Sequence, residues 1–105
     1  MALEITSTDF KTLISKKGIV VVDFWAPWCG PCRELEPIID LLDKRNSDSG
    51  VSIVKMNVES ESEVAKQFGV RNIPTIIYFK DGSPIERSIG LKDAYEIEAT
   101  IKRLK

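Results

Sequence analysis

The sequence predicts an α/β domain in which a central mixed sheet is flanked by helices on both faces. Three apolar runs rich in β-branched and aromatic residues, at 19–25, 51–58 and 75–79, alternate with stretches of helical periodicity. Strands separated by helices are typical of parallel crossovers. The Asp81-Gly82 dipeptide is a strong hairpin signal, so the strand after it, 84–89, is expected to add an antiparallel edge. The predicted order is therefore βα-βα-βα-ββα.

The first half of the chain supplies two strand–helix units. Residues 3–5 alternate like a short strand, and the helix expected after them ends at Gly18. The run 19–25 suits a central strand buried on both faces, although it contains one charged residue, Asp23. The next helix has an apolar stripe at i, i+3, i+4 and i+7, made by Leu35, Ile38, Ile39 and Leu42. Pro37 lies inside this stripe and should kink the helix rather than end it.

The second half repeats the alternation. The strand expected at 51–58 carries Lys55 in its middle, and a short helix follows that Gly69 ends. The strand at 75–79 comes directly after Ile73-Pro74. Gly90 marks a turn, after which Asp93 is expected to cap the last helix.

Length and charge limit the possible functions. We expect 105 residues to form one domain, 1–105, whose core is large enough to fold without disulfide staples. The net charge of −1, with no block of like charges, argues against a nucleic-acid or membrane-surface partner. The sequence has no signal peptide and no apolar run of the ~18–20 residues that a membrane span needs, so we expect a cytoplasmic protein.

The chain contains no histidine. This excludes Cys–His nucleophilic catalysis, Ser–His–Asp hydrolysis and histidine metal ligands. With only two cysteines, a zinc site would need carboxylates for its remaining ligands, so we expect no metal and no bound cofactor.

Both cysteines lie in one stretch, Trp28-Cys29-Gly30-Pro31-Cys32, between a predicted buried strand and a predicted helix. Four interpretations compete: a metal site, two inert core thiols, a static disulfide, or a redox-active pair. The first lacks ligands, and a Gly-Pro turn does not bury its flanks. A static disulfide stabilises by closing a loop, and this loop is very short. A redox-active pair is therefore favoured.

The position of the two thiols predicts their roles. Cys29 precedes the helix, where unpaired N–H groups and the helix dipole favour a thiolate, so its pKa should fall below the ~8.5 of a free thiol. Cys32 lies one turn inside, where it is less exposed and close enough to resolve a mixed disulfide. Cys29 is thus the expected attacking thiol and Cys32 the expected resolving thiol.

Over essentially its full length the chain resembles the thioredoxin family. The residues that carry the resemblance are Val22-Asp23-Phe24-Trp25-Ala26-Pro27-Trp28-Cys29-Gly30-Pro31-Cys32, Pro37, Lys55, Ile73-Pro74-Thr75, Lys80-Asp81-Gly82 and Gly90. The resemblance implies the thioredoxin fold and a monomeric protein-disulfide reductase. Its partners would be disulfide-containing client proteins and a thioredoxin reductase, with NADPH used only indirectly through that reductase. Departures from the commonest family pattern at Glu34, Glu36 and Leu91 bear on partner preference and on the pKa of Cys29.

The resemblance also assigns supporting roles. Asp23 could be a carboxylate facing solvent at a strand end, but the apolar run around it favours a buried acid with a raised pKa. By resemblance it would exchange protons with Cys32 through water, and Lys55 would offset its charge. Gly30 and Pro31 would tune the redox pair, and Ile73-Pro74 would be a cis bond. The expected substrate-binding residues are Trp28, Ile73, Pro74 and Gly90.

Two other interpretations remain open at this point. Oxidases and isomerases of similar fold usually carry histidine between their cysteines, so Gly-Pro and the lack of histidine favour a reductant. The chain could also serve as a structural subunit or a dedicated redox partner. Retention of both cysteines, Asp23 and Pro74 argues against lost chemistry but leaves a second, structural role possible.

Overall fold

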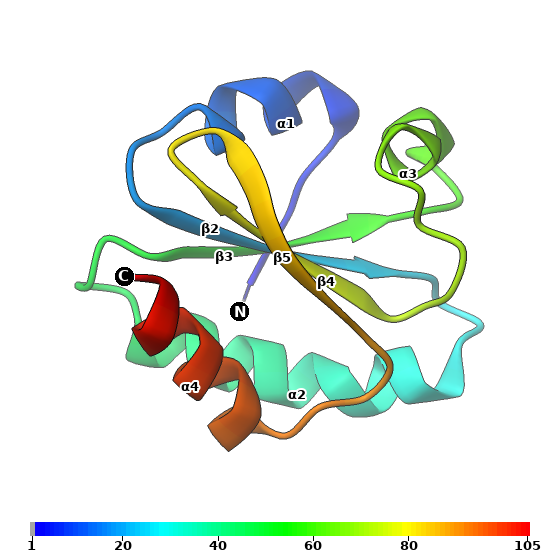
Figure 1. Cartoon of the computed structure of the whole chain (residues 1–105). Helices are drawn as coiled ribbons and strands as arrows, with labels where there is room; N and C mark the ends of the chain where they lie inside the picture. The colour runs from blue at the N-terminus through cyan, green and yellow to red at the C-terminus, as the bar shows by residue number, and fades with distance from the viewer. Residues whose placement is uncertain (1) are drawn as a thin grey trace.

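A computed structural model describes residues 2–105 and shows a five-stranded sheet between two layers of helices (Figure 1). The elements follow the predicted order: β1 (Leu3–Glu4), α1 (Ser7–Ile14), β2 (Ile19–Trp25), α2 (Gly30–Arg45), β3 (Ser52–Asn57), α3 (Ser62–Gln67), β4 (Thr75–Lys80), β5 (Ser83–Ile89) and α4 (Ala94–Leu104). The prediction of an α/β domain with a mixed sheet and helices on both faces is confirmed.

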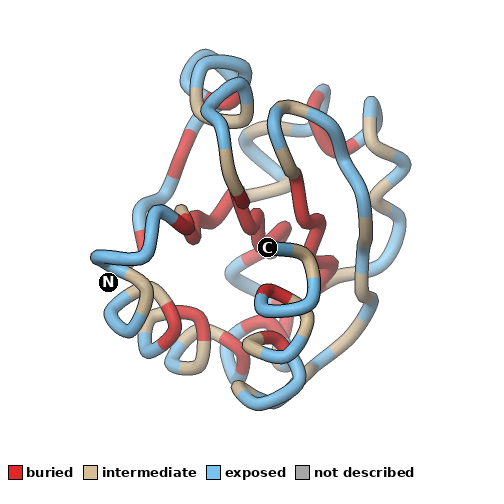
Figure 2. The backbone as a smooth tube through the Cα atoms, turned by 60° about the vertical axis from the view of Figure 1, so that its left-hand side comes forward, coloured by how far each residue is buried: buried red, intermediate tan, exposed pale blue. Residues whose placement is uncertain are grey.

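The strands are arranged in the order β1-β3-β2-β4-β5. The central strand β2 pairs with β3 in parallel and with β4 in antiparallel orientation, and β5 forms the antiparallel edge after the predicted hairpin. Every residue of β2 before Trp25 is buried, as its continuous apolar run predicts. The buried segments in Figure 2 lie along the central strands and on turns of the helices that pack against them.

The expectation that every strand following a helix would run parallel is wrong for β4, which is antiparallel to β2. Helix α3 is short: six helical residues span about 9 Å, less than half of the about 20 Å of a six-residue strand, so α3 alone does not span the length of the sheet. Strand β4 instead begins near the end of the sheet at which β3 finishes, since Thr75 pairs with Phe24.

The two faces of the sheet have separate cores. Helices α2 and α4 cover one face, where Val21 and Ile76 pack against Leu35, Ile39 and Ile97. Helices α1 and α3 cover the other face, which contains a group of three aromatic rings in edge-to-face contact, Phe10, Phe68 and Phe79. Side chains alternate along β2, so successive residues enter different cores.

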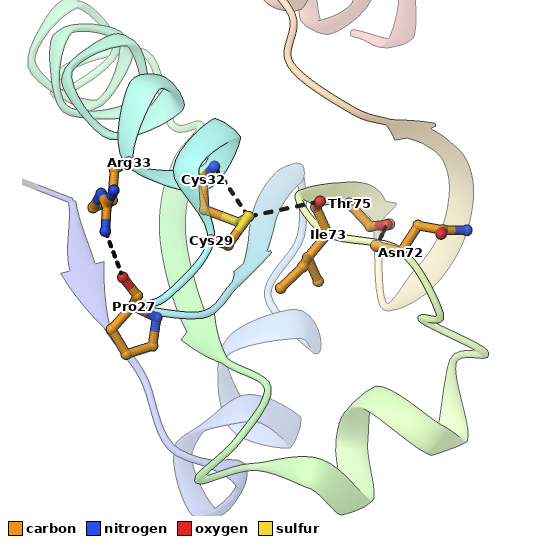
Figure 3. Close-up of a disulfide and its surroundings, with 7 residues drawn as sticks. All are labelled: Pro27, Cys29, Cys32, Arg33, Asn72, Ile73 and Thr75. Atoms are coloured by element: carbon orange, nitrogen blue, oxygen red, sulfur yellow. Dashed lines mark hydrogen bonds between the residues drawn. A yellow bond between two sulfur atoms is a disulfide. The ribbon is translucent and has the colours of Figure 1, made fainter.

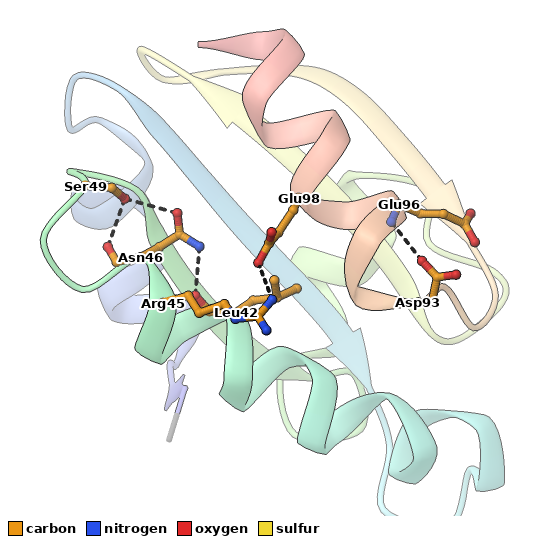
Figure 4. Close-up of polar contacts among 7 residues, drawn as sticks. All are labelled: Leu42, Arg45, Asn46, Ser49, Asp93, Glu96 and Glu98. Atoms are coloured by element: carbon orange, nitrogen blue, oxygen red, sulfur yellow. Dashed lines mark hydrogen bonds and ion pairs between the residues drawn. The ribbon is translucent and has the colours of Figure 1, made fainter.

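Polar contacts at the ends of α2 and α4 are shown in Figure 4. The carboxylate of Asp93 accepts a hydrogen bond of 2.8 Å from the backbone N–H of Glu96, which confirms Asp93 as the cap of α4. Arg45 at the end of α2 forms a 2.8 Å ion pair with Glu98 of α4. Helix α2 continues through Pro37, as predicted. The N-terminus of α2 lies at the two cysteines.

Candidate active site

Cys29 and Cys32 form a disulfide at the N-terminus of α2 (Figure 3). Cys29 is the N-cap residue with an extended backbone, and Gly30 and Pro31 make the first helical turn. Proline suits this position because the first N–H groups of a helix have no partner within it. The turn places the two Cα atoms 5.2 Å apart, and the N–H of Cys32 donates a 3.2 Å hydrogen bond to Cys29 Sγ. A donor aimed at this sulfur would stabilise a thiolate there.

Both cysteines are buried in the disulfide, so the expectation that the Gly-Pro turn leaves its flanks exposed is wrong. Cys29 is 6% exposed and Cys32 is 2% exposed, which makes Cys29 slightly the more exposed residue of the two. Both pack with Ala26 in a small apolar cluster that also contacts Ile73. In the disulfide Cys29 Sγ carries no hydrogen, and it lies 3.8 Å from the carbonyl oxygen of Ile73.

The loop before β4 passes beside the disulfide. Its Ile73–Pro74 peptide bond is cis, as the resemblance implies. Pro74 is buried, and its carbonyl oxygen accepts a 2.8 Å hydrogen bond from the N–H of Gly90. The hydroxyl of Thr75 donates to the carbonyl oxygen of Asn72 within the same loop. The structure thus brings Ile73, Pro74 and Gly90 together with the dithiol.

Several apolar side chains near the site are exposed. Trp28, directly before Cys29, is 64% exposed, which matches the prediction that it belongs to a surface rather than to the core. Ile89 and Leu91, on either side of the half-buried Gly90, are also exposed. Ile89 is not among the residues that the sequence singles out. The available signal is its place next to Gly90 at the end of an edge strand.

Asp23 is fully buried on the face of β2 that α2 covers, at 1% exposure. Its Oδ1 has no hydrogen-bond partner among the residues that the structure describes. Burial raises the pKa of Asp23 from 3.8 to about 7, because desolvation disfavours the carboxylate; Lys55 opposes this rise, and Glu4 and Glu36 add to it. The predicted buried acid with a raised pKa is therefore present, and it titrates near neutral pH.

Lys55 lies opposite Asp23 in the β2–β3 register and is only 7% exposed. Its Nζ is 3.8 Å from Glu36 Oε2 and 5.5 Å from the centre of the Trp25 ring. Trp25 in turn donates a 3.1 Å hydrogen bond to Glu4 Oε2. The sequence does not place Glu36 in this group, although its spacing of four residues from Cys32 puts both side chains on one face of α2.

Within residues 2–105 no group of three or more histidine, cysteine or acidic side chains could hold a metal ion. No helix of this described region is long and apolar enough to cross a membrane. The chemistry that the described site offers is that of its two cysteines, with the buried Asp23 on the face of β2 that the same helix, α2, covers.

Comparisons with known proteins agree with this geometry. The family model described as Thioredoxin matches residues 1–103. Thioredoxin 1 of Synechococcus elongatus is 43% identical over 91 residues, covering 86% of this chain and 84% of the relative. Thioredoxin of Chlamydia muridarum is 44% identical over 91 residues, covering 87% of each chain.

Solved structures show the same similarity. A mutant thioredoxin from Halobacterium salinarum NRC-1 superposes with a TM-score of 0.88 at 31% identity, covering 97% of this chain and 88% of the other. A chain from a study of thiol resolution in a yeast mitochondrial 1-Cys peroxiredoxin, through the glutathione and thioredoxin systems, gives a TM-score of 0.86 at 32% identity, covering 97% and 94%. The chain belongs to the thioredoxin family, and it is a thiol–disulfide oxidoreductase whose redox centre is the Cys29–Cys32 disulfide.

Proposed function

We propose that the protein is a general protein-disulfide reductase, which a thioredoxin reductase re-reduces with electrons from NADPH. The observation that carries the proposal is the Cys29–Cys32 pair at the start of α2, with Cys29 directly after the exposed Trp28. The Gly-Pro sequence between the cysteines and the absence of histidine favour reduction over oxidation.

In the first step the reduced Cys29 thiolate attacks one sulfur of a client disulfide. A bond forms between Cys29 Sγ and that sulfur, and the other client sulfur leaves as a thiolate. The helix N-terminus and the N–H of Cys32 support the negative charge on Cys29 before attack.

In the second step Cys32 resolves the mixed disulfide. Its thiol loses a proton to the Asp23 carboxylate through water, and the Cys32 thiolate attacks Cys29 Sγ, releasing the second client thiolate. The two client thiolates then take up one proton that Asp23 returns and one from solvent, so the client gains two electrons and two protons while Cys29 and Cys32 are oxidised to the disulfide. A group with a pKa of about 7 suits this role, because it both accepts and returns a proton near neutral pH.

Client binding uses the surface around Cys29. The exposed indole of Trp28 and the half-buried Ile73 offer apolar contact, and the turn at Gly90 borders the site. An extended client segment would pair with the backbone beside Pro74 through strand-like hydrogen bonds. We further propose that the protein acts as a monomer in the cytoplasm, where reducing conditions suit a dithiol reductant, and that it needs neither nucleic acid nor membrane.

The test is NADPH-coupled reduction of a protein disulfide in the presence of a thioredoxin reductase. We expect NADPH consumption that depends on the protein, and no consumption with the Cys29→Ser, Cys32→Ser double variant. Absence of turnover with several thioredoxin reductases would contradict the proposal. A double variant that still supports the cellular role would indicate instead a structural subunit.

A further inference from the structure

The buried ammonium of Lys55 has two carboxylates competing for it. A buried charge needs an opposite charge or hydrogen bonds to offset its lost hydration. Asp23 faces Lys55 from the neighbouring strand, whereas Glu36 reaches it from α2, with Oε2 3.8 Å from Nζ. The Glu36 side chain is 40% exposed, so it contacts Lys55 from the solvent side, whereas Asp23 is buried.

The position of the ammonium is further constrained by Trp25. Lys55 Nζ lies 5.5 Å from the centre of the indole ring, within the range of a cation–π contact. The hydrogen bond from Trp25 Nε1 to Glu4 holds the ring in place. With Nζ paired to Glu36, Asp23 Oδ1 is left without a hydrogen-bond partner among the described residues.

The groups around Asp23 come from every element packed against it. Glu4 belongs to β1, Lys55 to β3 and Glu36 to α2, while β4 presents the apolar Ile76. The cysteines of α2 are uncharged as a disulfide. One ammonium therefore faces three carboxyl groups, and the fully buried Asp23 is the one whose ionisation is least favourable.

We propose that Glu36 is a positioning residue for the Asp23 carboxyl, because it competes with that carboxyl for the ammonium of Lys55. Without the Glu36 carboxylate, the ammonium of Lys55 would interact with Asp23 alone, and the carboxyl of Asp23 would lose its proton more readily. With the Glu36 carboxylate present, Asp23 keeps its proton into the neutral range. The inference deepens the proposed function, since it rests on Asp23 as the proton acceptor for Cys32.

The experiment follows the carboxyl carbon of Asp23 by NMR as pH is varied, on the ¹³C-labelled, oxidised protein. We expect Glu36→Gln to lower the pKa of Asp23 by about half a unit to one unit, from the change in Coulomb interaction at these separations. In a Lys55→Gln background the same substitution should move the titration less than half as far, because the shared ammonium is absent. Glu36→Asp keeps the negative charge, so the pKa of Asp23 in this variant should stay closer to the native value than in Glu36→Gln.

Glu34→Gln is the matched control. It removes the same charge from the same helix two residues away, and Glu34 does not contribute to the pKa shift of Asp23, so the titration should not move. An unchanged pKa in Glu36→Gln would overturn the proposal, and so would an equal shift in both backgrounds, which would mean that Glu36 acts only through its own field. The titration needs no turnover, so its outcome is separate from that of the NADPH assay.

Discussion

The two faces of strand β2 differ in what they bury, although they belong to the same seven residues. Val20, Val22 and Phe24 enter a wholly apolar core beneath α1 and α3. Asp23, on the opposite face beneath α2, is a carboxyl group with an unpaired oxygen. Burying such a group costs stability, whereas burying the apolar residues provides it. The face beneath α1 and α3 therefore only stabilises the fold. The face beneath α2 also has an apolar core, but it includes the group that we assign to proton transfer, whose burial costs part of that stability.

The largest expected effect comes from the cysteines at the start of α2, the helix that covers the Asp23 face. Cys29→Ser removes the attacking sulfur, and turnover in the NADPH-coupled assay should fall at least about a thousandfold, to background. Cys32→Ser should instead retain attack and accumulate a mixed disulfide with the client, visible as an added mass. Residual turnover by Cys29→Ser above that of the double variant would contradict the assignment of Cys29 as the attacking thiol.

The apolar face should respond in stability and not in chemistry. Phe10 is 2% exposed and lies 5.4 and 5.6 Å from the rings of Phe68 and Phe79. Phe10→Ala should lower the free energy of unfolding by about 3–5 kcal/mol, measured by urea denaturation. Phe10→Leu, which keeps most of the apolar volume, should lose less. Turnover of either variant at temperatures where it is folded should match the native rate; a slower rate would break the separation of the two faces.

Asp23→Asn should affect both properties. The pKa of Asp23 is about 7 in the folded state and 3.8 in the unfolded state, so the folded state binds more protons between these values. Stability should therefore fall as pH rises from about 4 to about 7, then level off, with a total loss on the order of 4 kcal/mol. Asp23→Asn should lack this loss, and it should exchange disulfides at least about tenfold more slowly at pH 7. Parallel pH profiles of stability in the two proteins would contradict the assignment.

Trp28→Ala should have the smallest effect, and only on binding. Because this side chain is 64% exposed, the free energy of unfolding should change by no more than about 0.5 kcal/mol. Loss of the apolar contact should lower kcat/KM for a protein disulfide about 5- to 30-fold. A small-molecule disulfide serves as the control, since it needs little of this surface. An equal loss for both substrates would argue against a docking role.

Much of this division can be predicted from the sequence. Local patterns determine the elements, so the run at 19–25 and the stripe on α2 predict a buried strand and a packed helix. The apolar neighbours of Asp23 predict its burial. The direction of β4 cannot be predicted in the same way, because it depends on the path of the whole connection between β3 and β4, of which α3 is only a part. The contact between Glu36 and Lys55 depends on side chains from α2 and β3 meeting in space, which no local pattern encodes.

The reduction potential of the Cys29–Cys32 pair tests the central claim, that the site is a reductant, most directly. It is measured by equilibrating the protein with glutathione or dithiothreitol buffers and quantifying the two redox forms. We expect a reduction potential of about −270 mV, the value known for thioredoxin. A value between about −180 and −120 mV, as in disulfide isomerases and oxidases, would contradict the claim.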